Sequence, residues 1–239
     1  MKDDSFKLNL SITSVAGPDA KDFLHRMTTQ NINGLELGSC AGGALLQANG
    51  TIISYFIIYH IKEKEYWLIG EKTFSKATYE ALEKFHFAED LEIKDISDQS
   101  NEKSLEIWKQ HTKASFNFQF GVDITEKNMI LEAPLNDFVA RNKGCYPGQE
   151  VVERVFTYGN LGKKLVGLKG ADTRKIKAGA AVFVSDENVG VITSVENEMA
   201  FAILRRPHYE EGQMVKVENI QLIVFKLPGT FEIARELKK

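Results

Sequence analysis

Along the first 70 residues, apolar side chains recur at every second position in some segments, as in a strand, and at helical spacing in another. Residues 6–12 alternate apolar and polar side chains, which predicts a half-buried strand. Residues 17–27 begin with Gly-Pro-Asp and continue with apolar side chains along one helix face, which predicts a helix. Residues 44–61 form two β-rich runs around Asn49-Gly50, a dipeptide typical of hairpin turns, and residues 65–70 predict a third strand.

Residues 73–122 also predict both a helix and strands. Thr73 is positioned to cap a helix whose apolar stripe runs over residues 74–85. Residues 91–96, 105–108 and 116–122 each alternate again and predict strands. We therefore expect an α+β domain in which an antiparallel or mixed sheet has its packed helices on one side.

Residues 128–141 predict a short helix, and Pro134 suits its first turn. Glu132 would then precede that helix, on a loop leading toward residue 143. From the residues alone, a solvent-facing carboxylate is the ordinary interpretation of Glu132.

The C-terminal third predicts short, regularly spaced strands. Such a series is typical of a small barrel or sandwich. Because residues 158–164 have the composition of a boundary, we predict one domain over residues 1–160 and another over residues 161–239, ending in a short charged tail. The predicted strands are 165–168, 181–184, 190–195, 200–204, 214–217 and 222–225.

Composition and charge narrow the class of protein. A net charge of -3 over 239 residues gives no overall drive toward nucleic acid or membrane. The N-terminus has no apolar run, and the longest near-apolar stretch, residues 51–61, is about half the length that spans a bilayer. The two cysteines, Cys40 and Cys145, lie far apart in sequence and suit a reducing compartment. These features predict a cytoplasmic protein.

Local charge clusters and histidines leave alternatives open. Residues 79–106 hold nine acids against three lysines, which is typical of a solvated face, with a docking surface as the alternative. Residues 163–177 hold six basic residues against one Asp, again a solvated face or a phosphate contact. No metal-ligand spacing appears among the five histidines, and nothing selects one of them as a partner for a cysteine.

The segment Lys143–Glu150, Lys-Gly-Cys-Tyr-Pro-Gly-Gln-Glu, is the most constrained part of the sequence. Its glycines and proline predict a tight turn that holds Cys145 in a fixed direction. Residues 149–155 predict a helix, with Glu150 and Arg154 as a supporting pair. A helix N-terminus and the nearby Lys143 would favour the thiolate, whereas the alternative is a thiol that only fills a small hole.

The segment Lys143–Glu150 resembles the signature of the YgfZ family, folate-binding proteins related to the T-protein of the glycine cleavage system. Three other segments are similar to that family: residues 15–29, the hairpin residues 44–50, and Gly-Val-Ile-Thr-Ser at residues 190–194. The resemblance implies a T-protein-like folate-binding domain followed by a C-terminal antiparallel β-barrel.

The resemblance also implies a cofactor, partners and a site. The cofactor would be tetrahydrofolate or a related folate, and the partners iron–sulfur proteins or their assembly factors. In the folate-binding relatives, an acidic residue at the place of Glu132 binds the pterin ring, because a carboxylate accepts two parallel N–H bonds from a flat amino-heterocycle. Cys145 would be the reactive residue. The residues implied in folate binding are Glu132, Lys143, Gly144, Tyr146, Gln149, Glu150 and Arg154.

One departure separates the sequence from the aminomethyltransferase relatives. They carry an acidic pair after the first hairpin turn, where this chain has Ser54-Tyr55. A hydroxyl does not stabilise a developing cationic amine as a carboxylate does. We therefore expect an accessory protein for the assembly or repair of iron–sulfur enzymes, including tRNA-modifying ones. The alternatives are an aminomethyltransferase-type one-carbon transfer enzyme and an interaction module that has lost folate binding.

Overall fold

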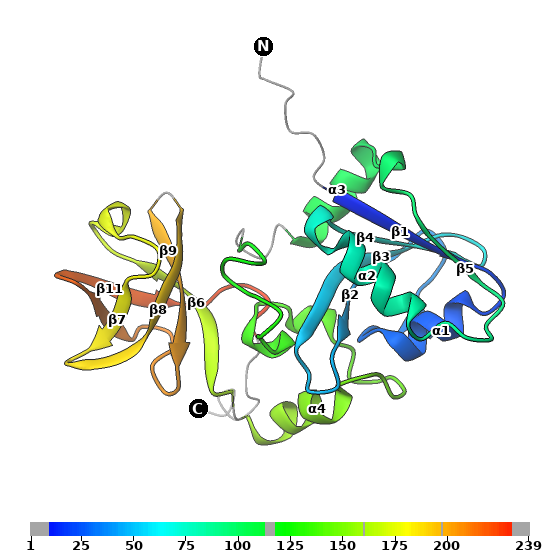
Figure 1. The fold of residues 1–239 in the computed structure, drawn as a ribbon. Helices are drawn as coiled ribbons and strands as arrows, with labels where there is room; N and C mark the ends of the chain where they lie inside the picture. The colour runs from blue at the N-terminus through cyan, green and yellow to red at the C-terminus, as the bar shows by residue number, and fades with distance from the viewer. Residues whose placement is uncertain (1–9, 113–117, 160, 197, 231–239) are drawn as a thin grey trace, which may run out of the picture. The chain divides into compact units, whose positions relative to one another are not determined.

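The computed structural model describes residues 10–112, 118–159, 161–196 and 198–230 (Figure 1). By its internal contacts the chain divides into two compact units. Unit 1 consists of residues 1–114 and 137–150, and unit 2 of residues 115–136 and 151–239. This discontinuous division differs from the single boundary after residue 160, because the segment 115–136 groups with the second unit. The continuous boundary stays a prediction.

Unit 1 is built on a five-stranded antiparallel sheet with the order β2-β3-β4-β1-β5. The hairpin predicted around Asn49-Gly50 is confirmed, and Gly50 has the positive φ of 80° that glycine adopts without strain. The strands are β1 Leu10–Ala16, β2 Cys40–Leu46, β3 Ile52–Lys62, β4 Glu65–Glu71 and β5 Glu92–Asp95.

Helices cover both faces of this sheet, so the prediction of helices on one side is wrong. Helices α1 (Ala20–Met27) and α2 (Ser75–Glu83) share a buried core with Phe56 and Ile58 of β3. Helix α3 (Glu102–Thr112) packs on the opposite face, where Tyr55 stacks on Trp108. Because successive strand residues point to opposite faces, β3 supplies apolar side chains to both layers.

Helix α3 also replaces the strand predicted over residues 105–108. A short apolar run of this kind fits the spacing of a strand as well as that of a helix. The helix begins after Asn101, whose side-chain oxygen accepts a hydrogen bond from the Ser104 N–H (3.1 Å), as an N-cap does. The cap, more than the apolar pattern, marks this segment as a helix.

Two other local predictions need correction. Of the strand predicted over residues 6–12, residues 6–9 lie outside the described part, and the observed strand β1 continues to Ala16. It is buried on both faces, including Ser11, Thr13 and Ser14, because helices cover both faces of the sheet. Thr73 does not cap a helix: it lies in the 3₁₀ turn η2 (Lys72–Phe74), and α2 starts at Ser75. The predicted stripe ends early, since Phe85 is exposed.

The stretch before the motif is irregular. Of the strand predicted over residues 116–122, residues 116 and 117 lie outside the described part, and the others form turns with one isolated bridge between Phe120 and Ile124. The helix predicted over residues 128–141 is two 3₁₀ turns separated by Pro134, which lacks the N–H a continuous helix needs. The 3₁₀ turns are η1 Ile32–Gly34, η3 Ser97–Gln99, η4 Ile130–Glu132, η5 Asn136–Phe138 and η6 Thr173–Lys175.

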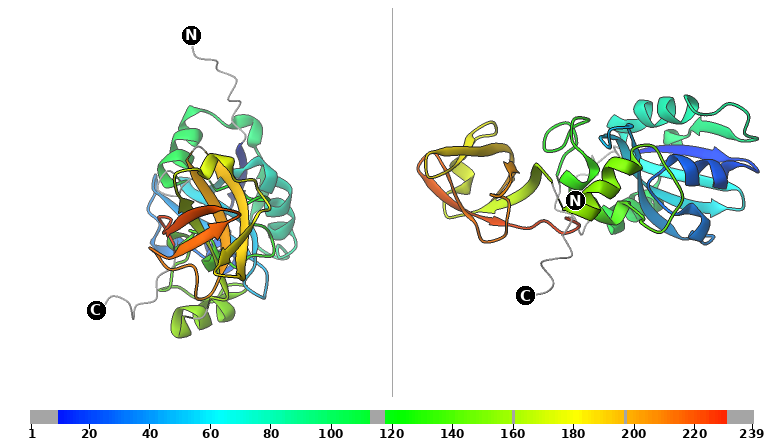
Figure 2. Two further views of the ribbon diagram at one scale, coloured as in Figure 1. Left: turned by 90° about the vertical axis from the view of Figure 1, so that its left-hand side faces the viewer. Right: turned by 90° about the horizontal axis from the view of Figure 1, so that it is seen from below.

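Unit 2 contains a closed six-stranded barrel with the order β10-β11-β6-β9-β8-β7 (Figure 2). Each predicted C-terminal strand is present, and their inward residues form a continuous apolar core. Helix α4 (Gln149–Tyr158) precedes the barrel and confirms the helix predicted from residue 149. The predicted tail, residues 231–239, lies outside the described residues. The barrel strands are β6 Lys163–Lys169, β7 Ala181–Val184, β8 Glu187–Glu196, β9 Met199–Arg205, β10 Met214–Val217 and β11 Ile220–Phe225.

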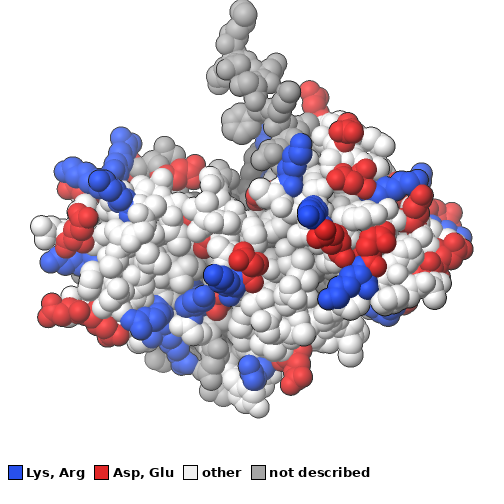
Figure 3. Space-filling model, viewed as in Figure 1, with Lys and Arg blue, Asp and Glu red and all other residues white. Residues whose placement is uncertain are grey.

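Basic and acidic side chains are interspersed on the face shown in Figure 3. In the acid-rich segment 79–106, several carboxylates pair with nearby bases, such as Glu89 with Arg26 and Glu92 with Lys94. Among the described residues, no helix is long and apolar enough to cross a membrane. The same residues contain no group of three His, Cys, Asp or Glu side chains placed to hold a metal ion.

Candidate functional site

The motif turn lies against the β2–β3 hairpin of unit 1. Gly148 has a φ of 81°, and a Cβ there would lie 2.4 Å from the backbone oxygen of Gln47. Both the backbone angle and the close approach require glycine. The Gln149 N–H donates to the Tyr146 oxygen (3.2 Å), and helix α4 starts at Gln149. The turn therefore holds Cys145 four residues ahead of a helix.

The thiol of Cys145 is exposed at this turn, which argues against the alternative of a thiol that fills a hole. A Cβ on the preceding Gly144 would lie 3.7 Å from Nε2 of His25 in α1. The structure thus selects His25 as the histidine beside the motif, a choice that the sequence left open. Burial and the charge of Lys143 lower the pKa of His25, which favours a neutral imidazole.

Lys143 connects the motif to the end of helix α1. Its Nζ donates hydrogen bonds to the backbone oxygens of His25 and Thr28 and lies 4.9 Å from the centre of the Tyr146 ring. These carbonyl groups are at the negative end of α1, where an ammonium is stabilised. Burial lowers the pKa of Lys143 to about 8, and the thiol of Cys145 opposes that shift. Lys143 therefore ties the motif turn to the end of α1, and it also places a positive charge near Cys145.

The other predicted motif residues lie on the turn and on α4. Gly144 is exposed, Tyr146 is buried and Gln149 is partly buried. Glu150 and Arg154 are both exposed. Among the described residues no ion pair joins Glu150 and Arg154, although their four-residue spacing allows the predicted pair.

Glu132 belongs to unit 2 and is buried, which overturns the interpretation of a solvent-facing carboxylate. Its Oε2 accepts a hydrogen bond from Nδ2 of Asn128 (2.8 Å) and lies 3.7 Å from Nζ of Lys163. Burial raises the pKa of Glu132, while Asn128 and then Lys163 oppose the shift. Sequence reasoning missed both partners. Asn128 has the weak signal of a four-residue spacing, and Lys163 has none.

The segment 190–194 also gains a physical role. The hydroxyls of Thr193 and Ser194 donate to the same oxygen of buried Asp123, at 2.5 and 2.6 Å. The other Asp123 oxygen accepts from the Gln119 N–H (2.8 Å). Strand β8 therefore anchors the loop that leads toward Asn128 and Glu132, all within unit 2.

The hairpin positions that carry an acidic pair in the aminomethyltransferases are occupied here by Ser54 and Tyr55, which are both buried. Ser54 is fully buried, and its hydroxyl has no hydrogen-bond partner in the described part of the chain. The Tyr55 hydroxyl donates to Oε1 of Glu71 (2.7 Å), and burial raises the pKa of both groups. No carboxylate occupies either hairpin position.

Part of this chain is similar to a known protein domain. Residues 9–106 match the profile of the GCVT N-terminal domain. A putative chloroplastic transferase of Arabidopsis thaliana is 33% identical over 113 residues, a match that covers 44% of this chain and 26% of the relative. The chain thus spans about a quarter of that curated relative.

The fold has a counterpart among solved structures. The crystal structure of the glycine cleavage system aminomethyltransferase T from Bartonella henselae matches with a TM-score of 0.77 and 18% identity. The match covers 93% of this chain and 84% of that one. The domain match covers residues 9–106 and the structural match shows a shared fold, so the chain is similar to T-protein-like proteins, without singling out the YgfZ family among them.

Proposed function

We propose that the protein is a folate-binding accessory protein that supports the assembly or repair of iron–sulfur enzymes, including tRNA-modifying ones. The observation that carries the proposal is the exposed thiol of Cys145 on a glycine-fixed turn ahead of α4, in a T-protein-like fold. An accessible thiol on a rigid turn can meet an iron or sulfur atom of a client cluster with little loss of conformational entropy. YgfZ-type activity and the cytoplasmic location are part of the proposal.

The folate part of the proposal rests on Glu132. Asn128 donates to its Oε2, and no hydrogen bond to the other oxygen of this buried carboxyl group is found among the described residues. Such a group can bind the amino and ring N–H groups of a pterin, and a charge-assisted pair of this kind is strong. The resemblance of the segment Lys143–Glu150 to folate-binding proteins supports the choice of tetrahydrofolate.

Calorimetric titration with tetrahydrofolate tests this part. Wild type should bind, and Glu132→Gln should lose at least about tenfold in affinity, because one pterin N–H loses its acceptor charge. Glu126→Gln is the matched control, since Glu126 is an exposed acid six residues away on the same loop. Absence of binding by wild type, or equal affinities for all three proteins, would refute the folate site.

The thiol part is tested in cells that carry only a variant gene. We expect Cys145→Ala to lower the activity of iron–sulfur enzymes and Cys40→Ala to leave it near the wild-type level, because Cys40 is half-buried. Equal activities in the two variants would remove the proposed role of Cys145. If Cys145→Ala binds tetrahydrofolate normally yet fails in cells, the two parts of the proposal are separate.

One-carbon transfer is the second candidate, favoured by the GCVT domain match and the putative transferase relative. The buried Ser54 weighs against it, since neither Ser54 nor Tyr55 carries a carboxylate of its own to assist the transfer. Substrate-dependent formation of methylenetetrahydrofolate by the purified protein would establish this activity. Stable capture of an iron–sulfur protein without any folate binding would instead favour an interaction module.

A further inference from the structure

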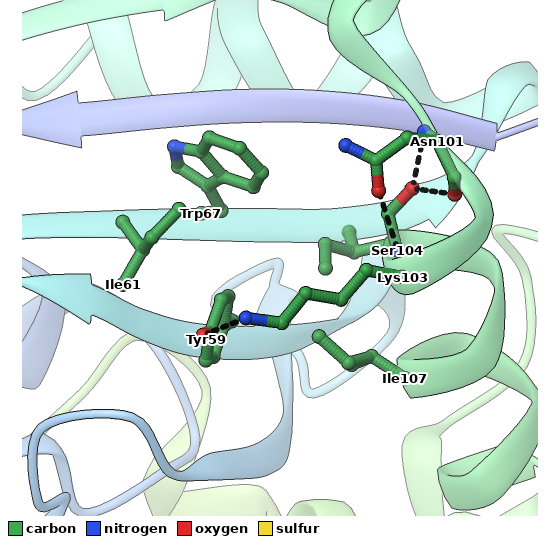
Figure 4. Close-up of a pocket in the computed structure, with 8 residues that line it drawn as sticks. Tyr59, Ile61, Trp67, Asn101, Lys103, Ser104 and Ile107 are labelled. Carbon is green, nitrogen blue, oxygen red and sulfur yellow. Dashed lines mark hydrogen bonds between the residues drawn. The ribbon is translucent and has the colours of Figure 1, made fainter.

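Unit 1 contains a second candidate site, away from the motif. A pocket of about 190 Å³ lies between strands β3 and β4 and the start of helix α3 (Figure 4). Its eight lining residues include no member of the motif and not Glu132. The pocket is therefore independent of the proposed folate site.

Two aromatic side chains form walls of this pocket. The rings of Tyr59 and Trp67 meet edge to face, with centroids 6.5 Å apart at 78°. Trp67 donates its Nε1–H to Oε1 of Glu65 (2.9 Å), and the Tyr59 hydroxyl accepts from Nζ of Lys103 (2.8 Å). Both rings are thereby fixed, so a flat ligand finds preformed aromatic surfaces.

The pocket has one cationic group and an apolar floor. Isoleucines 61, 69 and 107 supply aliphatic surface, and Lys103 extends from the first turn of α3 to the Tyr59 hydroxyl (Figure 4). Lys103 forms no ion pair with a carboxylate of the described residues, and its bond to Tyr59 uses one of three N–H groups. The hydrogen bond to Tyr59 raises the pKa of Lys103, so the ammonium persists at neutral pH.

Size limits the ligand to one ring. An apolar cavity of about 150 Å³ accepts benzene, whereas pockets for drug-sized molecules start at about 300 Å³. A volume of about 190 Å³ therefore suits a single aromatic ring with one small substituent. The ammonium of Lys103, which forms no ion pair among the described residues, favours a negative charge on that substituent.

We propose that this pocket binds a small monocyclic aromatic carboxylate, with the ring against Tyr59 and Trp67 and the carboxylate on Lys103. Asn101 and Ser104 line the opposite side of the pocket and are hydrogen-bonded to each other, whereas the Lys103 ammonium lies at the Tyr59 hydroxyl (Figure 4). The ligand would be a free metabolite-sized acid, and binding involves no covalent step.

Titration of the wild-type protein with sodium benzoate, followed by NMR of the two tryptophan indole N–H signals, tests the proposal. The chain contains only Trp67 and Trp108, and a Trp108→Phe variant serves to assign the signals. We expect a saturable shift of the Trp67 signal with a dissociation constant near or below about 1 mM, and little change at Trp108. Benzamide, which has the same shape without the charge, should bind at least about tenfold more weakly.

Lys103→Met removes the charge and keeps the aliphatic stem, and it should weaken benzoate binding about tenfold, equivalent to about 1.4 kcal/mol. Lys109→Met on the same helix is the control, because Lys109 is exposed and does not line the pocket. No saturation by about 10 mM, or equal shifts of both tryptophans, would overturn the site. Equal affinities for benzoate and benzamide, or an unchanged affinity in Lys103→Met, would overturn the choice of a carboxylate.

Discussion

The two cysteines of this protein occupy contrasting surroundings, although each has a lysine nearby. Cys145 is exposed on the motif turn, beside a lysine whose ammonium is tethered to the end of helix α1. Cys40 is half-buried on edge strand β2, opposite Tyr59, and its lysine neighbour is the exposed Lys103 of α3. Burial raises the pKa of the Cys40 thiol, and Lys103 opposes that shift.

The contrast shows that a lysine beside a thiol does not define a reactive site. Around Cys145 the backbone is constrained, the lysine is partly buried and the sulfur is accessible. Around Cys40 the lysine is accessible and the sulfur is partly covered. We therefore assign reactivity to the first region and noncovalent binding to the pocket next to the second.

The largest expected effect concerns the backbone that presents Cys145. Gly148→Ala should destabilise the protein by about 3 kcal/mol, because it adds a contact with the Gln47 oxygen to the strain of a positive φ. Gly38→Ala, near Cys40, should cost only about 1 kcal/mol, since Gly38 has the same φ with nothing within 4 Å of an added Cβ. Denaturant unfolding measures both, and equal losses would mean that the motif turn is not closely packed.

The next effect compares the thiols directly. At about pH 7.5, a water-soluble maleimide should label Cys145 about tenfold faster than Cys40, because exposure and thiolate fraction together set the rate. Mass spectrometry of the single-cysteine variants Cys40→Ser and Cys145→Ser gives the two rates. Labelling in urea is the control, where the difference should vanish. Faster labelling of Cys40 in the folded protein would reverse the assignment.

A smaller effect separates the lysines. Lys143→Met should destabilise the protein by about 1 kcal/mol, because the carbonyl groups of His25 and Thr28 lose their donor, which outweighs the relief of no longer burying a charge. Lys103→Met should change stability by less than about 0.5 kcal/mol, since Lys103 is exposed. Urea unfolding of both variants provides the measurement, and a larger loss for Lys103→Met would contradict the tether.

The smallest effect is a pH dependence. The pKa of Lys143 is lowered to about 8 from the ordinary 10.5, so between those values the unfolded chain binds more protons than the folded one. Stability should therefore rise with pH in that window, by about 0.5 kcal/mol relative to Lys143→Met. The rise is small because Lys143 is only partly buried and two carbonyl groups stabilise its ammonium. A fall in stability over this range, relative to the variant, would contradict the lowered pKa.

Several elements could be predicted because their signals are local. The Asn49-Gly50 hairpin, helix α1, the turn before α4 and the six barrel strands each follow from residues within a few positions of one another. Glu132 was predicted as a site residue only through the family resemblance. Its burial and its partner Lys163 depend on residues 31 positions apart, which no local pattern encodes.

The sequence by itself determined which elements form where apolar spacing and turn glycines agree, and which turn holds Cys145. Only the tertiary structure decided that α3 covers the second face of the sheet and that Lys143 of the motif bonds to His25. It also decided that Lys103, Tyr59 and Trp67 line one pocket. The physical reason is that spacing along a chain records which side of an element is apolar. It does not record which distant element will cover that side.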